Sequence, residues 1–186
     1  MDSFSFVFSL FGLLMGLALA EVIGGFGSAL EMRHKIRVGW LCPLLGLLIA
    51  FDLTSFWMDA WQIRSAIPVN FLSLAAGLIV FGIYYLIAQL AFPDDLEEWP
   101  DLDAYYFAHR RWLIGGMWTC NMLATLGEMA IGIHPFADLN TRYAFAALNL
   151  GAAGLMFLPG RRNNVALLLY QSALFPLFDV LGRMRN

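Results

Sequence analysis

The chain alternates long apolar runs with short polar segments. The apolar windows run approximately over residues 4–30, 40–61, 68–92, 112–133, 143–158 and 165–181. A helix of about 20 predominantly apolar residues crosses the hydrocarbon core of a bilayer. The last two windows are the shortest, so their boundaries are the least defined. This pattern predicts an all-α, polytopic transmembrane bundle of about six helices, in a single domain over residues 1–186.

Composition agrees with a membrane location. Hydrophobic residues make up 60% of the 186 residues and charged residues 13%, whereas soluble domains hold roughly half and a quarter. Six spans with short connections leave no room for a separate soluble catalytic domain. The first 20 residues contain Asp2 but no Lys or Arg, so we expect a retained span rather than a cleaved signal peptide.

Positive charge favours one orientation in the membrane. Alternate connections place one group of basic residues on one side: Arg33, Lys35, Arg37, Arg110, Arg111, Arg161 and Arg162. The smaller group on the other side is Arg64, Arg142, Arg183 and Arg185. Because cytoplasmic loops are enriched in Lys and Arg, both termini are predicted to lie outside. Six spans with compact loops and a Trp-rich acidic connector resemble many small bacterial inner-membrane proteins, and we expect that location. If window 165–181 does not cross, the C-terminus instead lies in the cytoplasm.

The net charge of −3 and the scattered basic clusters argue against nucleic acid as a partner. The composition predicts the lipid bilayer as the main partner. No cofactor is expected: the chain has no HExxH, no regular Cys/His spacing and no glycine-rich phosphate loop. Its one lysine, Lys35, lies in a basic loop, which excludes attachment of retinal inside a span.

An acidic connector joins the third and fourth windows over residues 93–111. Asp101 is suited to cap a short interfacial helix with aromatic side chains at the headgroup level: Tyr105, Tyr106, Phe107 and Trp112. This helix would lead into the fourth span. Alternatively, the connector docks a basic protein partner through its carboxylates: Asp94, Asp95, Glu97 and Glu98.

Two short segments resemble each other. AQLAFP at 88–93 and QSALFP at 171–176 each follow shortly after a Tyr. Two halves of three spans would have opposite orientations, so the match is consistent with a 3+3 inverted repeat of the kind found in transporters. Chance agreement in a biased composition is the alternative.

Small residues recur at four-residue spacing in the first window: Gly12, Gly16, Ala20, Gly24 and Ser28. Such a face allows close approach of another membrane helix. It therefore predicts a helix-packing seam, whose partner is either another span of this chain or a second copy in a homo-oligomer.

Carboxylates inside the spans are the most informative candidates, because ionisable groups in the hydrocarbon core are costly and usually functional. Asp52 lies near the middle of the second window, with Ser55 and Asp59 at i+3 and i+7 on the same helical face. We interpret this face as part of an ion or substrate pathway.

Further polar residues extend this pathway. Glu21 lies in the first window, and Glu128 lies in the fourth, with Asn121 and Thr125 at i−7 and i−3. With Asp179 near the end of the sixth window, these groups would form a series of acids across the membrane. The structural alternative is that hydrogen-bonded acids tie helices together.

Three functional classes follow from these residues. The first is a transporter or channel for protons, cations or a small solute, using the intramembrane carboxylates. The second is a non-catalytic membrane subunit that assembles with itself or with partner proteins. The third is an intramembrane enzyme, for which His109 with Asp101 or Asp103 is the acid-base candidate; no catalytic residue and no metal ligand is assigned.

Overall fold

The computed structural model describes the backbone of residues 3–185 and the side chains of residues 8–178 and 180. Its helices are α1 (Ser3–Glu31), α2 (Leu41–Gln62), α3 (Phe71–Gln89), α4 (Leu102–Ala130), α5 (Leu139–Phe157) and α6 (Arg161–Arg185), with a 3-10 turn, η1 (Pro135–Ala137). The described part contains no strand. The predicted all-α bundle is confirmed.

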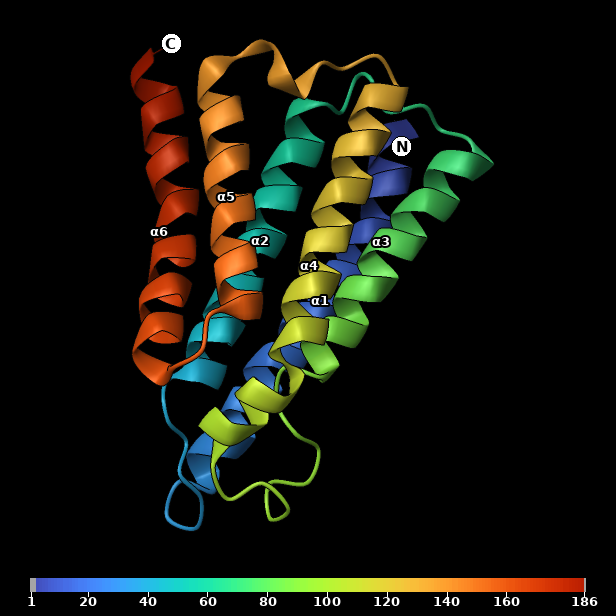
Figure 1. Cartoon of the computed structure of the whole chain (residues 1–186). Coiled ribbons are helices and arrows are strands. Elements are labelled where there is room, and N and C mark those ends of the chain that lie inside the picture. The colour runs from blue at the N-terminus through green and yellow to red at the C-terminus, as the bar shows by residue number, and fades with distance from the viewer. Residues whose placement is uncertain (1–2, 186) are drawn as a thin grey trace.

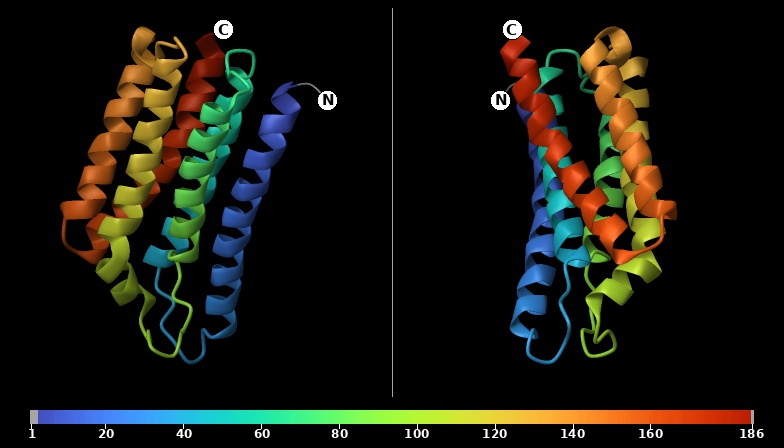
Figure 2. Two further views of the ribbon diagram at one scale, coloured as in Figure 1. Left: turned by 90° about the vertical axis from the view of Figure 1, so that its right-hand side faces the viewer. Right: turned by 60° about the vertical axis from the view of Figure 1, so that its left-hand side comes forward.

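The six α-helices run up and down along one direction (Figure 1). Both ends of the chain lie at one end of the bundle, here called the terminal end, and the connections after α1 and α3 lie at the connector end. Neighbouring helices form a ring in the order α1, α3, α4, α5, α6, α2, and α2 also contacts α4. Figure 2 shows α1 and α5 on opposite flanks of this ring.

Among the described residues, three helices are long and apolar enough to cross a membrane. They are α1 from Phe8, α2 and α3, with mean hydropathies of 1.8, 1.7 and 2.2. Large apolar side chains also face outward, with Ile23 62% and Leu150 74% exposed. Lipid accommodates such a surface, whereas water does not. These features are those of a membrane protein, and the crossing of α4, α5 and α6 stays a prediction.

Helix α4 begins earlier than the fourth window, because the expected interfacial helix is continuous with it. Asp101 caps it as expected, accepting a hydrogen bond from the backbone N of Asp103 at 2.9 Å. Tyr105 and Tyr106 do not face lipid, since they are 4% and 0% exposed, and their level in the membrane stays a prediction. Their hydroxyls donate inward, to Leu90 O and to the Asn164 side chain.

The connector packs on the basic loop of its own chain. The backbone N of Arg37 donates to Pro100 O at 2.7 Å, and that of Leu102 donates to Arg37 O at 3.0 Å. Ion pairs add to this contact: Lys35 with Glu97 at 3.4 Å and Arg37 with Asp101 at 3.2 Å. The basic group that the connector contacts here is therefore internal, and an external basic partner stays a prediction.

The small-residue face of α1 points away from the other helices along most of its length. Gly16, Ala20, Gly24 and Ser28 are exposed, and a Cβ added at Gly16 or Gly24 would meet nothing within 4 Å. At the other positions of this helix, larger side chains make the contacts inside the bundle: Phe11, Met15 and Val22 are buried. Of the three glycines in the predicted seam, Gly12 approaches a described neighbour, Trp57 on α2.

Candidate functional site

Three helices bring polar side chains together in the middle of the bundle. Asp52 on α2 is 3% exposed and accepts a hydrogen bond from the Tyr84 hydroxyl on α3. Asn121 on α4 donates its Nδ2 to Asp52 Oδ2 at 3.1 Å and lies 3.4 Å from Oδ1. A buried carboxylate needs such donors, since it has lost its hydration. This cluster is the polar centre of the fold.

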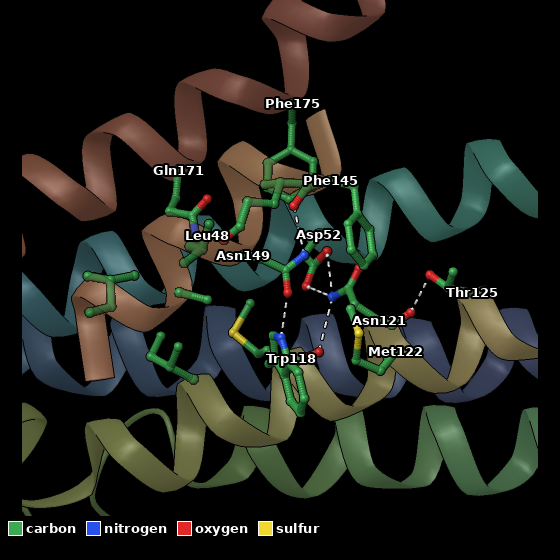
Figure 3. A pocket seen from close by; sticks show the side chains of 15 residues that line it. Leu48, Asp52, Trp118, Asn121, Met122, Thr125, Phe145, Asn149, Gln171 and Phe175 are labelled. Atoms are coloured by element: carbon green, nitrogen blue, oxygen red, sulfur yellow. Dashed lines mark hydrogen bonds between the residues drawn. The ribbon is translucent and has the colours of Figure 1, made fainter. Parts of the chain in front are cut away.

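A partly enclosed inner cavity of about 80 Å³ adjoins this cluster (Figure 3). Asp52, Asn121 and Thr125 line it together with aromatic rings from three helices: Trp118, Phe145 and Phe175. The indole Nε1 of Trp118 donates to Asn149 Oδ1 at 2.6 Å, which fixes the ring beside the cavity. Acidic, amide and aromatic groups therefore face one small space.

Gln171 on α6 also lines the inner cavity and is 4% exposed. Its Nε2 donates to Leu148 O at 2.9 Å, whereas its Oε1 has no hydrogen-bond partner. The amide lies against Gly151, where an added Cβ would stand 2.6 Å from Gln171 Cδ. In the sequence, Gln171 was considered only as the first residue of the QSALFP segment.

A wider outer vestibule of about 1050 Å³ lies between α2, α4, α5 and α6, toward the terminal end. Its lining is rich in polar side chains: Thr54, Ser55, Asp59, Gln62, Asp138, Asn140 and Thr141. Asn121, Leu148 and Phe175 line both the vestibule and the inner cavity. The two spaces are therefore adjacent, and polar groups extend from the terminal end to Asp52.

The predicted pathway residues divide into two groups. Asp52, Asn121, Thr125 and Asp59 line the inner cavity or the vestibule, whereas Glu21 and Glu128 line neither. Glu21 instead accepts a hydrogen bond from the Tyr85 hydroxyl at 3.3 Å, between α1 and α3. The side chain of Asp179 lies outside the described residues. A single series of acids that includes Glu21 is therefore not the arrangement found.

The inner cavity is closed toward the connector end. Leu48, Ile114 and Leu155 line it there and are each at most 4% exposed. Beyond them, Arg110 is 7% exposed and donates its Nη1 to Leu155 O, Leu158 O and the Asn164 side chain. Sequence reasoning had treated Arg110 only as one charge of a cytoplasmic cluster. Arg110 in fact joins α4 to the turn between α5 and α6.

Asp103 is the second buried carboxylate, at the connector end. Its Oδ1 accepts from the backbone N of Trp40 and Leu41 at 3.1 and 3.0 Å, at the start of α2. Its Oδ2 pairs with Arg161 Nε at 2.5 Å, at the start of α6. Asp103 therefore joins the first turns of three helices, a role that its sequence context did not indicate.

In the part of the chain that the structure describes, His109 forms no hydrogen bond or ion pair with Asp101 or Asp103, and Asp101 pairs instead with Arg37. Asp103 is held by Arg161, and His109 instead places Nδ1 3.0 Å from Tyr105 O, with its ring centroid 4.2 Å from that of Tyr105. Burial raises the pKa of Tyr105 to about 12, so its hydroxyl stays protonated as a donor to Leu90 O. Among the described residues no three His, Cys, Asp or Glu side chains converge as metal ligands.

The chain matches no family model, and no similarity to a curated protein or to a solved structure was found. Its function is therefore inferred from the polar centre and the two cavities beside it.

Proposed function

We propose that the protein is a small membrane transporter or channel that carries a cation or a small polar solute by way of Asp52. The observation that carries the proposal is the position of Asp52, a buried carboxylate that borders a cavity adjoining an open polar vestibule. Intramembrane carboxylates beside such cavities are typical of ion and substrate pathways.

The vestibule supports entry from the terminal end. It carries two carboxylates, Asp59 and Asp138, which attract cations and raise their local concentration. A cation that passes Asn121 then reaches Asp52, where the apolar side chains of Leu48, Ile114 and Leu155 end the route. Release at the connector end requires a second conformation in which these side chains separate, as in alternating access.

The direct test is flux in proteoliposomes. Asp52→Asn removes the charge but keeps an acceptor for Tyr84, so we expect a folded protein whose cation or proton flux falls to that of protein-free liposomes. Asp94→Asn, in the exposed connector, is the matched control and should keep wild-type flux. Wild-type flux in Asp52→Asn, or no flux of any cation or small polar solute tested in the wild type, would overturn the proposal.

A second candidate is a non-catalytic subunit that assembles through α1. The observation in its favour is that Gly16, Ala20, Gly24 and Ser28 form an exposed face that other helices of the chain do not cover. Small residues let two membrane helices approach closely, and a second copy of this chain offers a matching face. This candidate predicts a dimer in detergent and does not require Asp52.

A further inference from the structure

The inner cavity has room for a charged group but not for a ring. Asp52 lines it, and none of its described lining residues is Lys, Arg or His, so a bound cation meets a carboxylate without a competing positive side chain. Its volume of about 80 Å³ is roughly half of the 150 Å³ in which a benzene molecule fits. A primary ammonium on a short carbon arm can enter this space, whereas an aromatic ring must stay outside it.

The vestibule has room for a ring and offers an apolar wall to it. Its volume of about 1050 Å³ matches pockets for drug-sized ligands, which measure roughly 300 to 1000 Å³. Opposite its polar lining stand apolar side chains: Phe51, Met58, Ala144, Leu148, Leu174, Phe175, Pro176 and Phe178. An inorganic ion gains nothing from such a wall, whereas an organic molecule buries apolar surface against it. The vestibule therefore favours an organic ligand.

The two spaces meet beside Asp52. Asn121, which donates to Asp52 Oδ2 at 3.1 Å, lines both spaces, as does Phe175. Figure 3 shows the Phe175 ring on α6 directed toward Asp52 on α2. Ser55, in the vestibule, lies one turn beyond Asp52, a rise of about 4.5 Å along α2. Two carbon atoms between an ammonium and a ring span a similar distance, since three bonds of about 1.5 Å separate the two groups.

We propose that the protein binds an arylalkylammonium ion, with its ammonium beside Asp52 in the inner cavity and its aromatic ring in the vestibule. Phe51 and Phe178 pack against the ring, and Phe175, where the two spaces meet, also offers its face to the ammonium. Asp59, about 10 Å nearer the terminal end along α2, attracts the cation on entry. This inference rests on the proposed function, for which it names the substrate class.

The test compares ligands that differ in the ring or in the charge. Phenethylamine has both, propylamine lacks the ring, and phenylethanol lacks the charge. Binding of radiolabelled phenethylamine at neutral pH is measured on the purified protein in phosphatidylcholine nanodiscs, after subtraction of the amount bound by protein-free nanodiscs. Because the buried ring adds apolar area, we expect propylamine to compete at least about tenfold less well than unlabelled phenethylamine. Phenylethanol should compete no better than propylamine.

Two variants assign the two parts of the site. Asp52→Asn should bind neither amine, and Phe178→Ala should weaken phenethylamine about threefold or more without weakening propylamine. Phe71→Ala, which replaces a ring that is 86% exposed at the start of α3, is the matched control and should bind both amines as the wild type does. Equal competition by propylamine or by phenylethanol, or unchanged phenethylamine binding in Asp52→Asn or Phe178→Ala, would overturn the proposal. If a variant does not fold, the comparison of ligands on the wild type decides.

Failure of this inference is distinguishable from failure of the proposed function. No phenethylamine binding in the wild type, together with cation flux that depends on Asp52, overturns the arylalkylammonium ligand and leaves the transporter. Phenethylamine binding that depends on Asp52 and Phe178, without flux of any cation or polar solute, supports the site and overturns transport.

Discussion

The Tyr84 hydroxyl donates a hydrogen bond to Asp52, which joins α3 to α2 in the interior of the bundle. The next residue, Tyr85, donates to Glu21 on α1 at 3.3 Å. Consecutive residues of an α-helix point about 100° apart, so two adjacent tyrosines serve two carboxylates on different sides of α3. Only the Asp52 side borders the inner cavity.

This relationship predicts different effects for two equivalent substitutions. Tyr84→Phe leaves a buried carboxylate with one donor fewer, and we expect a loss of about 1 to 3 kcal/mol in unfolding free energy. Tyr85→Phe removes a longer bond at a half-buried site and should cost less than about 1 kcal/mol. Thermal unfolding in detergent compares the two; equal losses would show that Tyr84 does not support Asp52.

The missing side chain at Gly151 lets α5 and α6 approach closely, so a larger residue at this position should reduce stability. Gly151→Ala places a methyl group against the Gln171 amide, so the amide must shift, and we expect its bond to Leu148 O to weaken. We expect a loss of about 1 to 3 kcal/mol in stability and a change in ligand binding in the inner cavity. The control is Gly82→Ala on α3, where an added Cβ meets nothing within 4 Å. It should be neutral or slightly stabilising.

The helices could be predicted from the sequence because apolar periodicity and length are local properties. Each of the six windows corresponds to one helix, and the Asp101 cap was identified from its residue type and position. The segment that Asp101 caps was expected as a separate interfacial helix, whereas it is the beginning of α4, because a hydropathy window does not include the contacts with distant segments that bury Leu102, Tyr105 and Tyr106.

The candidate site could be predicted only in part. Asp52 and Asp59, at i+7 spacing, line the adjacent inner cavity and vestibule, and Asn121 lines both, since helical geometry is regular. Glu128, which follows Asn121 at the same spacing, lines neither space. Which faces meet depends on helix packing, which one sequence does not specify. The separation of Glu21 from Asp52, and the positions of Gln171 and Arg110, therefore became known only from the structure.

The contacts of Asp103 at the connector end predict a large loss of stability when this residue is replaced. Asp103→Ala removes the acceptor for the first two backbone N–H groups of α2 and the partner of Arg161, so we expect a loss of about 2 to 4 kcal/mol. Asp101→Ala breaks the more exposed pair with Arg37 and one cap bond, and should cost about 1 kcal/mol. Chemical unfolding in detergent checks the order, and a reversed order would contradict this role for Asp103.

The exposed face of α1 gives a prediction about assembly. Gly16→Leu adds a bulky group at a position where an added Cβ meets no other described segment within 4 Å, so the monomer should keep its stability. If α1 pairs with a second copy, the variant should shift from dimer to monomer in light scattering of the detergent-solubilised protein. Gly82→Leu, at another open helical position, should leave the size unchanged. A wild type that is monomeric in detergent and in lipid would exclude assembly through this face.

From the position of the vestibule we expect water to reach deep between the helices. Ser55 lines it, whereas Thr119 is exposed on the outer surface of α4, where lipid is expected. Cysteine reacts with charged thiosulfonates as the thiolate, which forms in water and not in lipid. Both native cysteines, Cys42 and Cys120, are buried, so they should contribute little background. We therefore expect Ser55→Cys to react and Thr119→Cys not to react.

The side of the membrane from which Ser55→Cys reacts tests the direction in which the vestibule opens. Ser65→Cys, in the exposed turn between α2 and α3 at the terminal end, marks one side of the membrane, and His34→Cys in the basic loop marks the other. An impermeant reagent should modify Ser55→Cys from the Ser65 side alone, because Leu48, Ile114 and Leu155 close the cavity toward the connector end. Modification from the His34 side would mean that the route continues past Asp52 in this conformation, as in an open channel.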